Sequence, residues 1–112
     1  MTDKRAAGWL DLGRPVGSEQ RYRRPAVIIS SDELNSGPSR LVIVVPVTSR
    51  RRGVPGHVQL AASRRTGLKQ TSWAKPEDIL STSRLRLDEY LGDVGDEAVE
   101  EIVKGVTRLL EA

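Results

Sequence analysis

The run Leu41-Val42-Ile43-Val44-Val45-Pro46-Val47 constrains the fold of this chain more than any other stretch. An unbroken apolar segment rich in β-branched residues predicts a strand that is buried on both faces and therefore central in a sheet. Pro46 has no backbone N–H to donate, so the strand must lack a partner on one side at that residue. Thr48 and Ser49 close the strand. The sequence therefore predicts a sheet protein built around residues 41–47.

Shorter segments add further elements to this sheet. Val99, Ile102 and Val106, together with Val103, Leu109 and Leu110, fall at helical spacing on one face of a terminal helix. Gly95 is an acceptable N-cap for it. Ser31–Asn35 has the capping chemistry of a single helical turn. We expect a mainly β domain, a small and strongly bent sheet or barrel, with the terminal helix packed on it as a lid. Further strands are predicted at residues 7–12, 24–31, 57–60, 69–74, 77–82 and 85–91.

Length and composition limit the class of protein. The chain of 112 residues is long enough for one domain with a single modest core, so we expect residues 1–112 to form one unit. It contains no Cys, which excludes a disulfide framework and a thiolate zinc site. No apolar run approaches the length of a membrane span, and residues 1–5 lead into no signal-like apolar region. We expect a cytoplasmic protein with no membrane partner.

The charge is distributed unevenly along the chain. Residues 1–86 carry 16 Lys and Arg against 7 Asp and Glu, whereas residues 87–112 carry 2 against 8. A basic body with an acidic end favours a polyanionic partner on one face and the acidic part turned away from it. The alternative is an ordinary solvated surface.

Two basic loops concentrate the positive charge. Arg14–Arg24 and Arg50–Arg52 each follow a predicted strand, so they form one positive groove if those strand ends meet at one rim. Arg matches phosphate through its bidentate fork, and neutralisation of the backbone dominates nucleic-acid affinity. Tyr22 can stack on a base, although aromatic residues are too few for a stacking platform. Alternatively, these Arg residues merely keep the loops soluble.

Candidates for catalysis are few. His57 is the only His, and a lone His before a strand is more often structural than catalytic; one His also cannot form a His-rich metal site. Glu19 and Arg24 lie at the start of one predicted strand. Thr48 and Ser49 lie at the end of the next. Arg stabilises a phosphorane-like charge, a Glu can accept a proton, and Thr can donate a hydrogen bond to phosphate. Such a set suits metal-free phosphodiester cleavage by an RNA 2′-hydroxyl, whereas the plain alternative for Glu19 and Arg24 is an ion pair.

An ordered series of short motifs resembles the MazF/PemK family of toxin endoribonucleases. The series runs from Gly17-Ser18-Glu19-Gln20 through Arg24-Pro25-Ala26-Val27-Ile28-Ile29-Ser30 and Val45-Pro46-Val47-Thr48-Ser49 to Gly53-x-Pro55. Asp11-Leu12-Gly13, Gly67-Leu68, Asp78-Ile79 and Arg84-Leu85 also look like that family. The chain departs from it at Arg5-Ala6-Ala7-Gly8-Trp9, which puts the edge of the first strand in question.

The resemblance implies an SH3-like barrel with a terminal helix, the CcdB/MazF-like toxin fold. It implies a homodimeric type II toxin that cuts single-stranded RNA at specific sequences without cofactor or metal, and a small antitoxin that occupies the RNA groove. By position, Arg24 and Thr48 match the catalytic residues of the family, and Glu19 matches a base proposed in some members. The remaining RNA-binding candidates are Ser18, Gln20, Arg21, Tyr22, Arg23, Ser49, Arg50, Arg51 and Arg52.

Two rival functions remain open on the same fold. One is a toxin that poisons DNA gyrase by protein binding, without catalysis. The other is an inactive RNA-binding relative. Arg24 and Thr48 together favour the enzyme, because a gyrase poison needs neither.

Overall fold

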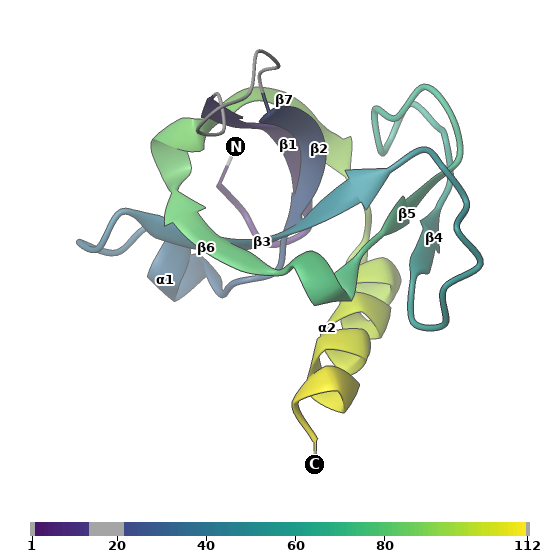
Figure 1. Cartoon of the computed structure of the whole chain (residues 1–112). Coiled ribbons are helices and arrows are strands. Elements are labelled where there is room, and N and C mark those ends of the chain that lie inside the picture. Colours follow the sequence, from purple (N-terminus) through teal and green to yellow (C-terminus); the bar gives the residue numbers. More distant parts are fainter. Residues whose placement is uncertain (1, 14–21, 112) are drawn as a thin grey trace.

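The strands of the chain form one strongly curled antiparallel sheet, which the computed structural model describes for residues 2–13 and 22–111. Figure 1 shows β1, β2, β3, β6 and β7 curling around a common interior, with β4 and β5 to one side and α2 extending away below. The predicted mainly β fold with a terminal helix is confirmed. In chain order the elements are β1 (Ala6–Gly13), β2 (Tyr22–Ile28), α1 (Asp32–Asn35), β3 (Leu41–Thr48), β4 (Val58–Leu60), β5 (Ser72–Ala74), the 3₁₀ turn η1 (Pro76–Asp78), β6 (Leu80–Ser83), the 3₁₀ turn η2 (Arg84–Arg86), β7 (Leu87–Asp93) and α2 (Asp96–Leu110).

The central strand β3 changes partner at the predicted position. One edge pairs with β2, where Ala26 lies opposite Pro46. The other edge pairs with β6 as far as Val44 and with β5 from Val47 onward. Pro46 lies in the gap between these two partners and still accepts a hydrogen bond on its carbonyl, from Lys75 N at 3.0 Å. The missing N–H of Pro46 therefore coincides with the place where the sheet divides.

Side chains alternate along β3 between two cores. Val42 and Val44 pack inside the curled sheet with Leu10, Ile28 and Leu87. Val45 and Val47 belong to the second core, on the other side of the strand, which includes Val99 and Ile102 of α2. All four β3 valines are at most 2% exposed. The prediction of a strand apolar on both faces is confirmed, because each face covers a separate core.

Only the first half of α2 packs closely against the sheet. Gly95 is the N-cap, as predicted, and Val99 and Ile102 are buried. Gly105 lies so close to η1 that an added Cβ would be 2.8 Å from Pro76 Cγ. Beyond this contact Leu109 and Leu110 are 60% and 80% exposed. The expected lid is therefore partial, and the apolar face of the helix runs past the surface that it covers.

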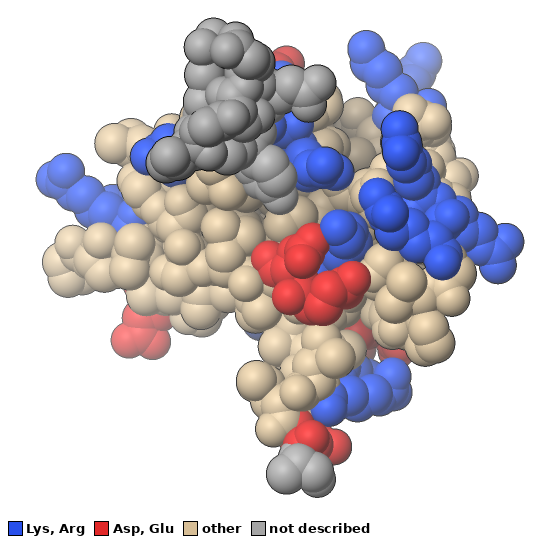
Figure 2. All heavy atoms as spheres, viewed as in Figure 1, with Lys and Arg blue, Asp and Glu red and all other residues tan. Residues whose placement is uncertain are grey.

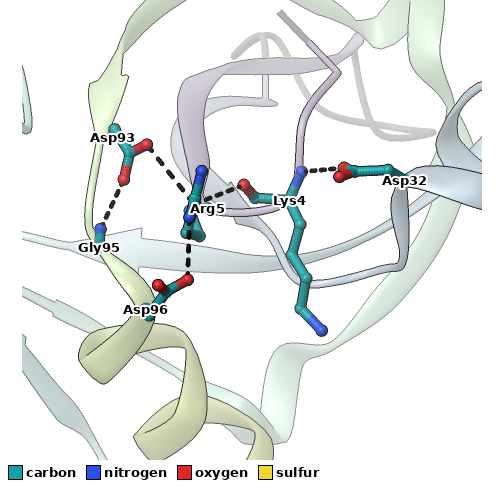
Figure 3. Close-up of polar contacts among 6 residues, drawn as sticks. All are labelled: Lys4, Arg5, Asp32, Asp93, Gly95 and Asp96. Carbon is teal, nitrogen blue, oxygen red and sulfur yellow. Dashed lines mark hydrogen bonds and ion pairs between the residues drawn. The ribbon is translucent and has the colours of Figure 1, made fainter.

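The first strand, β1, begins at Ala6, inside the stretch Arg5-Ala6-Ala7-Gly8-Trp9 where the chain departs from the family motif. β1 pairs with β2 on one side and with β7 on the other. Figure 3 shows how Arg5 fastens the start of this strand: its Nη1 donates to Asp96 Oδ1 at 3.0 Å and its Nε lies 3.6 Å from Asp93 Oδ2. The hydrogen bond to Asp96 is the main cause that raises the pKa of the Arg5 guanidinium. These contacts join the N-terminal segment to the beginning of α2.

Three predicted strands in the second half of the chain were partly wrong. Of residues 69–74 only Ser72–Ala74 form a strand. Residues 77–82 begin as the turn η1, and β6 starts only at Leu80. Pro76 stands at the first position of the turn, where a helix needs no N–H, and Asp78 N donates to Lys75 O at 2.9 Å. Leu85 lies in η2 and is 85% exposed, so the last strand begins at Leu87 instead. None of the helices in the described ranges is long and apolar enough to cross a membrane.

Candidate active site

The ends of β2 and β3 bring Arg24 and Thr48 to one cavity. The two strands are antiparallel, with Ala26 opposite Pro46. Continuing this register by two residues puts Arg24 across from Thr48. Both residues line the same cavity, whose volume is about 680 Å³. Arg24 is exposed, whereas Thr48 is 5% exposed and held in the strand.

Thr48 also organises the chain that follows it. Its Oγ1 accepts a hydrogen bond from Arg50 N at 3.2 Å, which turns the backbone at the end of β3. Because a hydroxyl both accepts and donates, this bond leaves the Thr48 proton available for an oxygen in the cavity. Ser49, Arg50 and Arg52 line the cavity as well. Arg51 does not, and lies instead with Arg52 at a second, smaller hollow.

The opposite wall comes from residues that were not predicted as site residues. Lys69, Gln70 and Ser72, from the segment that leads into β5, line the cavity. They reach it because β5 pairs with the end of β3, where Trp73 lies opposite Thr48. The sequence offered one signal for this wall, a Lys beside polar residues directly after Gly67-Leu68. Only the pairing of β5 with β3 shows that this segment reaches the cavity.

The third wall is formed by β1 and β7. Trp9 and Glu89 lie opposite each other in the register and both line the cavity. Glu89 belongs to the acidic part of the chain, so the prediction that this part turns away from the basic face is wrong at that residue. Sequence reasoning missed both residues, because the sequence does not show that β7 pairs with β1.

Arg23 supports this wall from outside the cavity. Its Nη2 donates to Asp88 Oδ1 at 2.9 Å and to Glu89 Oε2 at 3.2 Å, and its Cζ lies 4.6 Å from the centroid of the Trp9 ring. The hydrogen bond to Asp88 is the first cause that raises the Arg23 pKa. Although Arg23 was predicted to bind RNA, the structure gives it protein partners and it does not line the cavity.

Positive charge gathers on the side of the molecule that carries the cavity rim. Figure 2 shows Lys and Arg side chains over the loops around β4 and β5, with a smaller acidic patch near the centre of the view. Among the residues that the structure describes, five cationic side chains line the two hollows: Arg24, Arg50, Arg51, Arg52 and Lys69. A polyanion therefore meets a favourable potential at this rim.

Several predicted site residues lie outside the described residues. These are Ser18, Glu19, Gln20 and Arg21, and for Tyr22 only the backbone, which pairs with Gly13, is described. His57 lies away from the cavity; its side chain is 4% exposed and its Nε2 lies 2.6 Å from Glu77 Oε2. Within residues 2–13 and 22–111, no three His, Cys, Asp or Glu side chains are grouped so as to hold a metal ion.

Comparison with known proteins gives the family. A profile described as PemK-like, MazF-like toxin of type II toxin–antitoxin system matches residues 8–110. The chain belongs to this toxin family. The resemblance inferred from the motifs is thereby confirmed over nearly the whole sequence.

Individual MazF relatives agree with the family. Endoribonuclease MazF6 of Mycobacterium tuberculosis is 32% identical over 105 residues, which span 92% of this chain and 91% of the relative. Endoribonuclease EndoA of Bacillus subtilis is 29% identical over 93 residues, 82% of this chain and 79% of the relative. Since these MazF-type relatives are endoribonucleases, the predicted enzyme class is confirmed, and the gyrase poison is the weaker reading.

Solved MazF structures have the same fold. MazF from Deinococcus radiodurans superposes with a TM-score of 0.79 at 30% identity, covering 96% of this chain and 94% of that one. A MazE–MazF complex from the same organism gives a TM-score of 0.81 at 30% identity, with the same coverage. The predicted MazF-like toxin fold is confirmed.

Proposed function

We propose that this toxin cleaves single-stranded RNA at specific sequences, without a metal ion, in the cavity between the ends of β2 and β3. The observation that carries the proposal is that Arg24 and Thr48 line one cavity with further cations at its rim. This pairing supplies a fixed positive charge and a hydroxyl donor beside each other, which is what a phosphodiester needs when negative charge develops on it.

In the proposed reaction the 2′-oxygen of the RNA attacks the adjacent phosphorus. The bond from phosphorus to the 5′-oxygen breaks, which leaves a 2′,3′-cyclic phosphate and a 5′-hydroxyl. Arg24 stabilises the charge on the phosphorane oxygens, since a guanidinium stays protonated throughout. Thr48 donates to one of these oxygens. Glu19 takes the 2′-hydroxyl proton, and the departing 5′-oxygen takes a proton from water.

We further propose that the whole chain of 112 residues acts as one cytoplasmic toxin domain, dimerises, and binds a small antitoxin across the same cavity. The apolar end of α2 supports dimerisation, because Leu109 and Leu110 are exposed there. The MazE–MazF complex from Deinococcus radiodurans supports an antitoxin partner. Light scattering of the purified protein measures the oligomeric state, and a monomer at micromolar concentration would contradict the dimer.

The test is cleavage of a long single-stranded RNA in EDTA, with the ends mapped by primer extension. The wild-type protein should make discrete cuts, and Arg24→Ala should make none. Arg64→Ala is the matched control: it removes one exposed Arg that lines neither hollow, and it should cut normally. If folded wild-type protein makes no cuts, the proposal fails and a gyrase supercoiling assay follows. If Arg24→Ala cuts at the wild-type rate, the site assignment is wrong.

A further inference from the structure

A second hollow adjoins the proposed cleavage cavity. Its volume is about 320 Å³, within the range of pockets that hold small ligands. The side chains relevant here are Arg51, Arg52, Pro55, His57, Gln59 and Trp73. Arg52 lines both the hollow and the cavity, so the loop after β3 forms the ridge between them.

The strand β5 lines both spaces. Ser72 lines the cavity and its neighbour Trp73 lines the hollow. Successive side chains of a strand point to opposite faces, so Ser72 and Trp73 project to opposite sides of β5, whereas Trp73 and its cross-strand partner Thr48 project to the same side. Trp73 pairs with Thr48 on one side and with Gln59 on the other. The hollow is therefore one strand away from the residue that we place at the scissile phosphate.

The walls of the hollow have the chemistry that holds a nucleotide. Trp73 is half-buried, so its ring is fixed by the sheet and still accessible. Aromatic faces stack on bases of any sequence, and Arg guanidiniums bind phosphate. Arg51 and Arg52 are both exposed, and Arg52 lies on the path between the spaces. A strand leaving the cavity over this ridge would place a phosphate at Arg52 and the next base beside Trp73.

His57 adds an unsatisfied polar group to the same wall. The Glu77 carboxylate only accepts, so the 2.6 Å contact requires His57 Nε2 to carry a proton. The other ring nitrogen, Nδ1, is the one buried side-chain polar atom without a hydrogen-bond partner within the described ranges. Such orphan atoms are rare in folded proteins and require an explanation. Because Nδ1 is itself closed to solvent, it marks an incompletely bonded wall of the hollow and is not one of the contacts assigned to the nucleotide.

We propose that this hollow is a subsite for a nucleotide that flanks the cleaved bond, with its base stacked on Trp73 and its phosphate held at Arg52. The inference rests on the proposed function, since it takes the RNA to be cut in the adjoining cavity. The hollow adds a second contact to the RNA, so the toxin would bind a longer stretch of RNA than the nucleotides at the scissile phosphate.

The experiment uses short RNAs made uncleavable by a 2′-deoxy sugar at the mapped cut, lengthened one nucleotide at a time from each end. In wild-type protein, one of these additions should tighten binding about tenfold, the contribution of one stacked base. Trp73→Ala should abolish that gain and leave the affinity for the shortest RNA unchanged, whereas Trp73→Phe should keep most of it. Replacing the added nucleotide by an abasic one should cause the same loss in wild-type protein.

The control variant is Tyr90→Ala, which removes an aromatic ring that is 54% exposed and lines neither hollow. This variant should show the full increase in RNA affinity when the nucleotide is added. If Trp73→Ala does not fold, Trp73→Leu replaces it, because an aliphatic side chain fills this half-buried position without offering an aromatic face. Trp73→Leu should lose the gain in affinity from the added nucleotide and keep the affinity for the shortest RNA.

The outcomes separate the two proposals. If the protein cuts RNA but no added nucleotide changes the affinity by more than twofold, the subsite is wrong and the cleavage cavity stands. If Trp73→Ala weakens antitoxin binding alone, the hollow serves a protein partner and the inference is overturned. If the wild-type protein neither cuts nor binds RNA, the proposed function is wrong, and the subsite that depends on it is wrong as well.

Discussion

Thr48→Val separates the catalytic role of Thr48 from its structural role. The change keeps the β-branched shape of a strand residue that is 5% exposed and removes only the hydroxyl. The structural loss is one hydrogen bond, from Arg50 N at 3.2 Å, worth about 1 kcal/mol. Arg50 itself is exposed, so water can replace the missing acceptor and the cost should lie at or below that figure. We therefore expect a folded variant with a small change in urea midpoint.

The catalytic loss should be much larger. Removing one preorganised donor to a developing oxyanion typically costs about 100- to 1,000-fold in kcat, or about 3 to 4 kcal/mol. Single-turnover cleavage of a short RNA that carries the mapped site measures this, with RNA affinity measured in parallel on the uncleavable analogue. The rate constant should fall by at least about 100-fold while affinity changes little. Thr48→Ser, which keeps the hydroxyl, should recover most of the rate.

Two results would refute this reasoning. A Thr48→Val variant that cuts at the wild-type rate would remove Thr48 from the chemistry. A variant whose rate recovers at saturating RNA, with affinity reduced instead, would show that Thr48 acts only by shaping the loop after β3.

Three further predictions test the packing and the charges. Ile102→Ala, at a side chain that is 0% exposed, should lower the free energy of unfolding in urea by about 2 to 5 kcal/mol, whereas Leu85→Ala, at 85% exposure, should leave it almost unchanged; equal effects would contradict the packing of α2 through Ile102. Arg23→Ala should change the stability little, because its ion pairs are solvent-exposed, and in a Trp73→Phe background it should red-shift the emission of Trp9; no shift would show that Arg23 does not cover that ring. Replacing Arg50–Arg52 by Ala should lower the slope of log affinity against log salt by about 0.7 for each phosphate of the single-stranded RNA that these side chains neutralise, and an unchanged slope would exclude this loop from the RNA backbone.

The sequence predicted those parts of the fold that depend on local pattern. Residues 41–47 indicated a central strand because an unbroken apolar run has no other stable place, and Pro46 marked where its partner changes. Residues 76–78 were predicted less well, since Pro76 is equally compatible with a strand start and with the first position of a turn. The extent of α2 coverage also escaped prediction, because helical spacing shows which face is apolar and not how much of it is covered.

The cavity was predicted in part for a similar reason. Arg24 begins one strong strand signal and Thr48 ends the next, so their meeting at one rim could be expected from neighbouring strand ends. Lys69, Ser72 and Glu89 come from segments that reach the cavity only through pairings distant in sequence. Such pairings depend on register and sheet order, neither of which a single strand pattern encodes.

The partner change of β3 at Pro46 has a consequence for how the molecule opens. The small unit formed by β4 and β5 is attached to β3 through the pairs of Val47 with Ala74 and of Thr48 with Trp73, whereas β6 pairs with β3 along Leu41–Val44. Fewer backbone bonds hold the first unit, so its amides should exchange with deuterated water through local openings of lower free energy than those of Val42–Val45. The walls that β5 supplies to both hollows can then loosen and re-form around an incoming strand while the curled sheet beneath them stays closed.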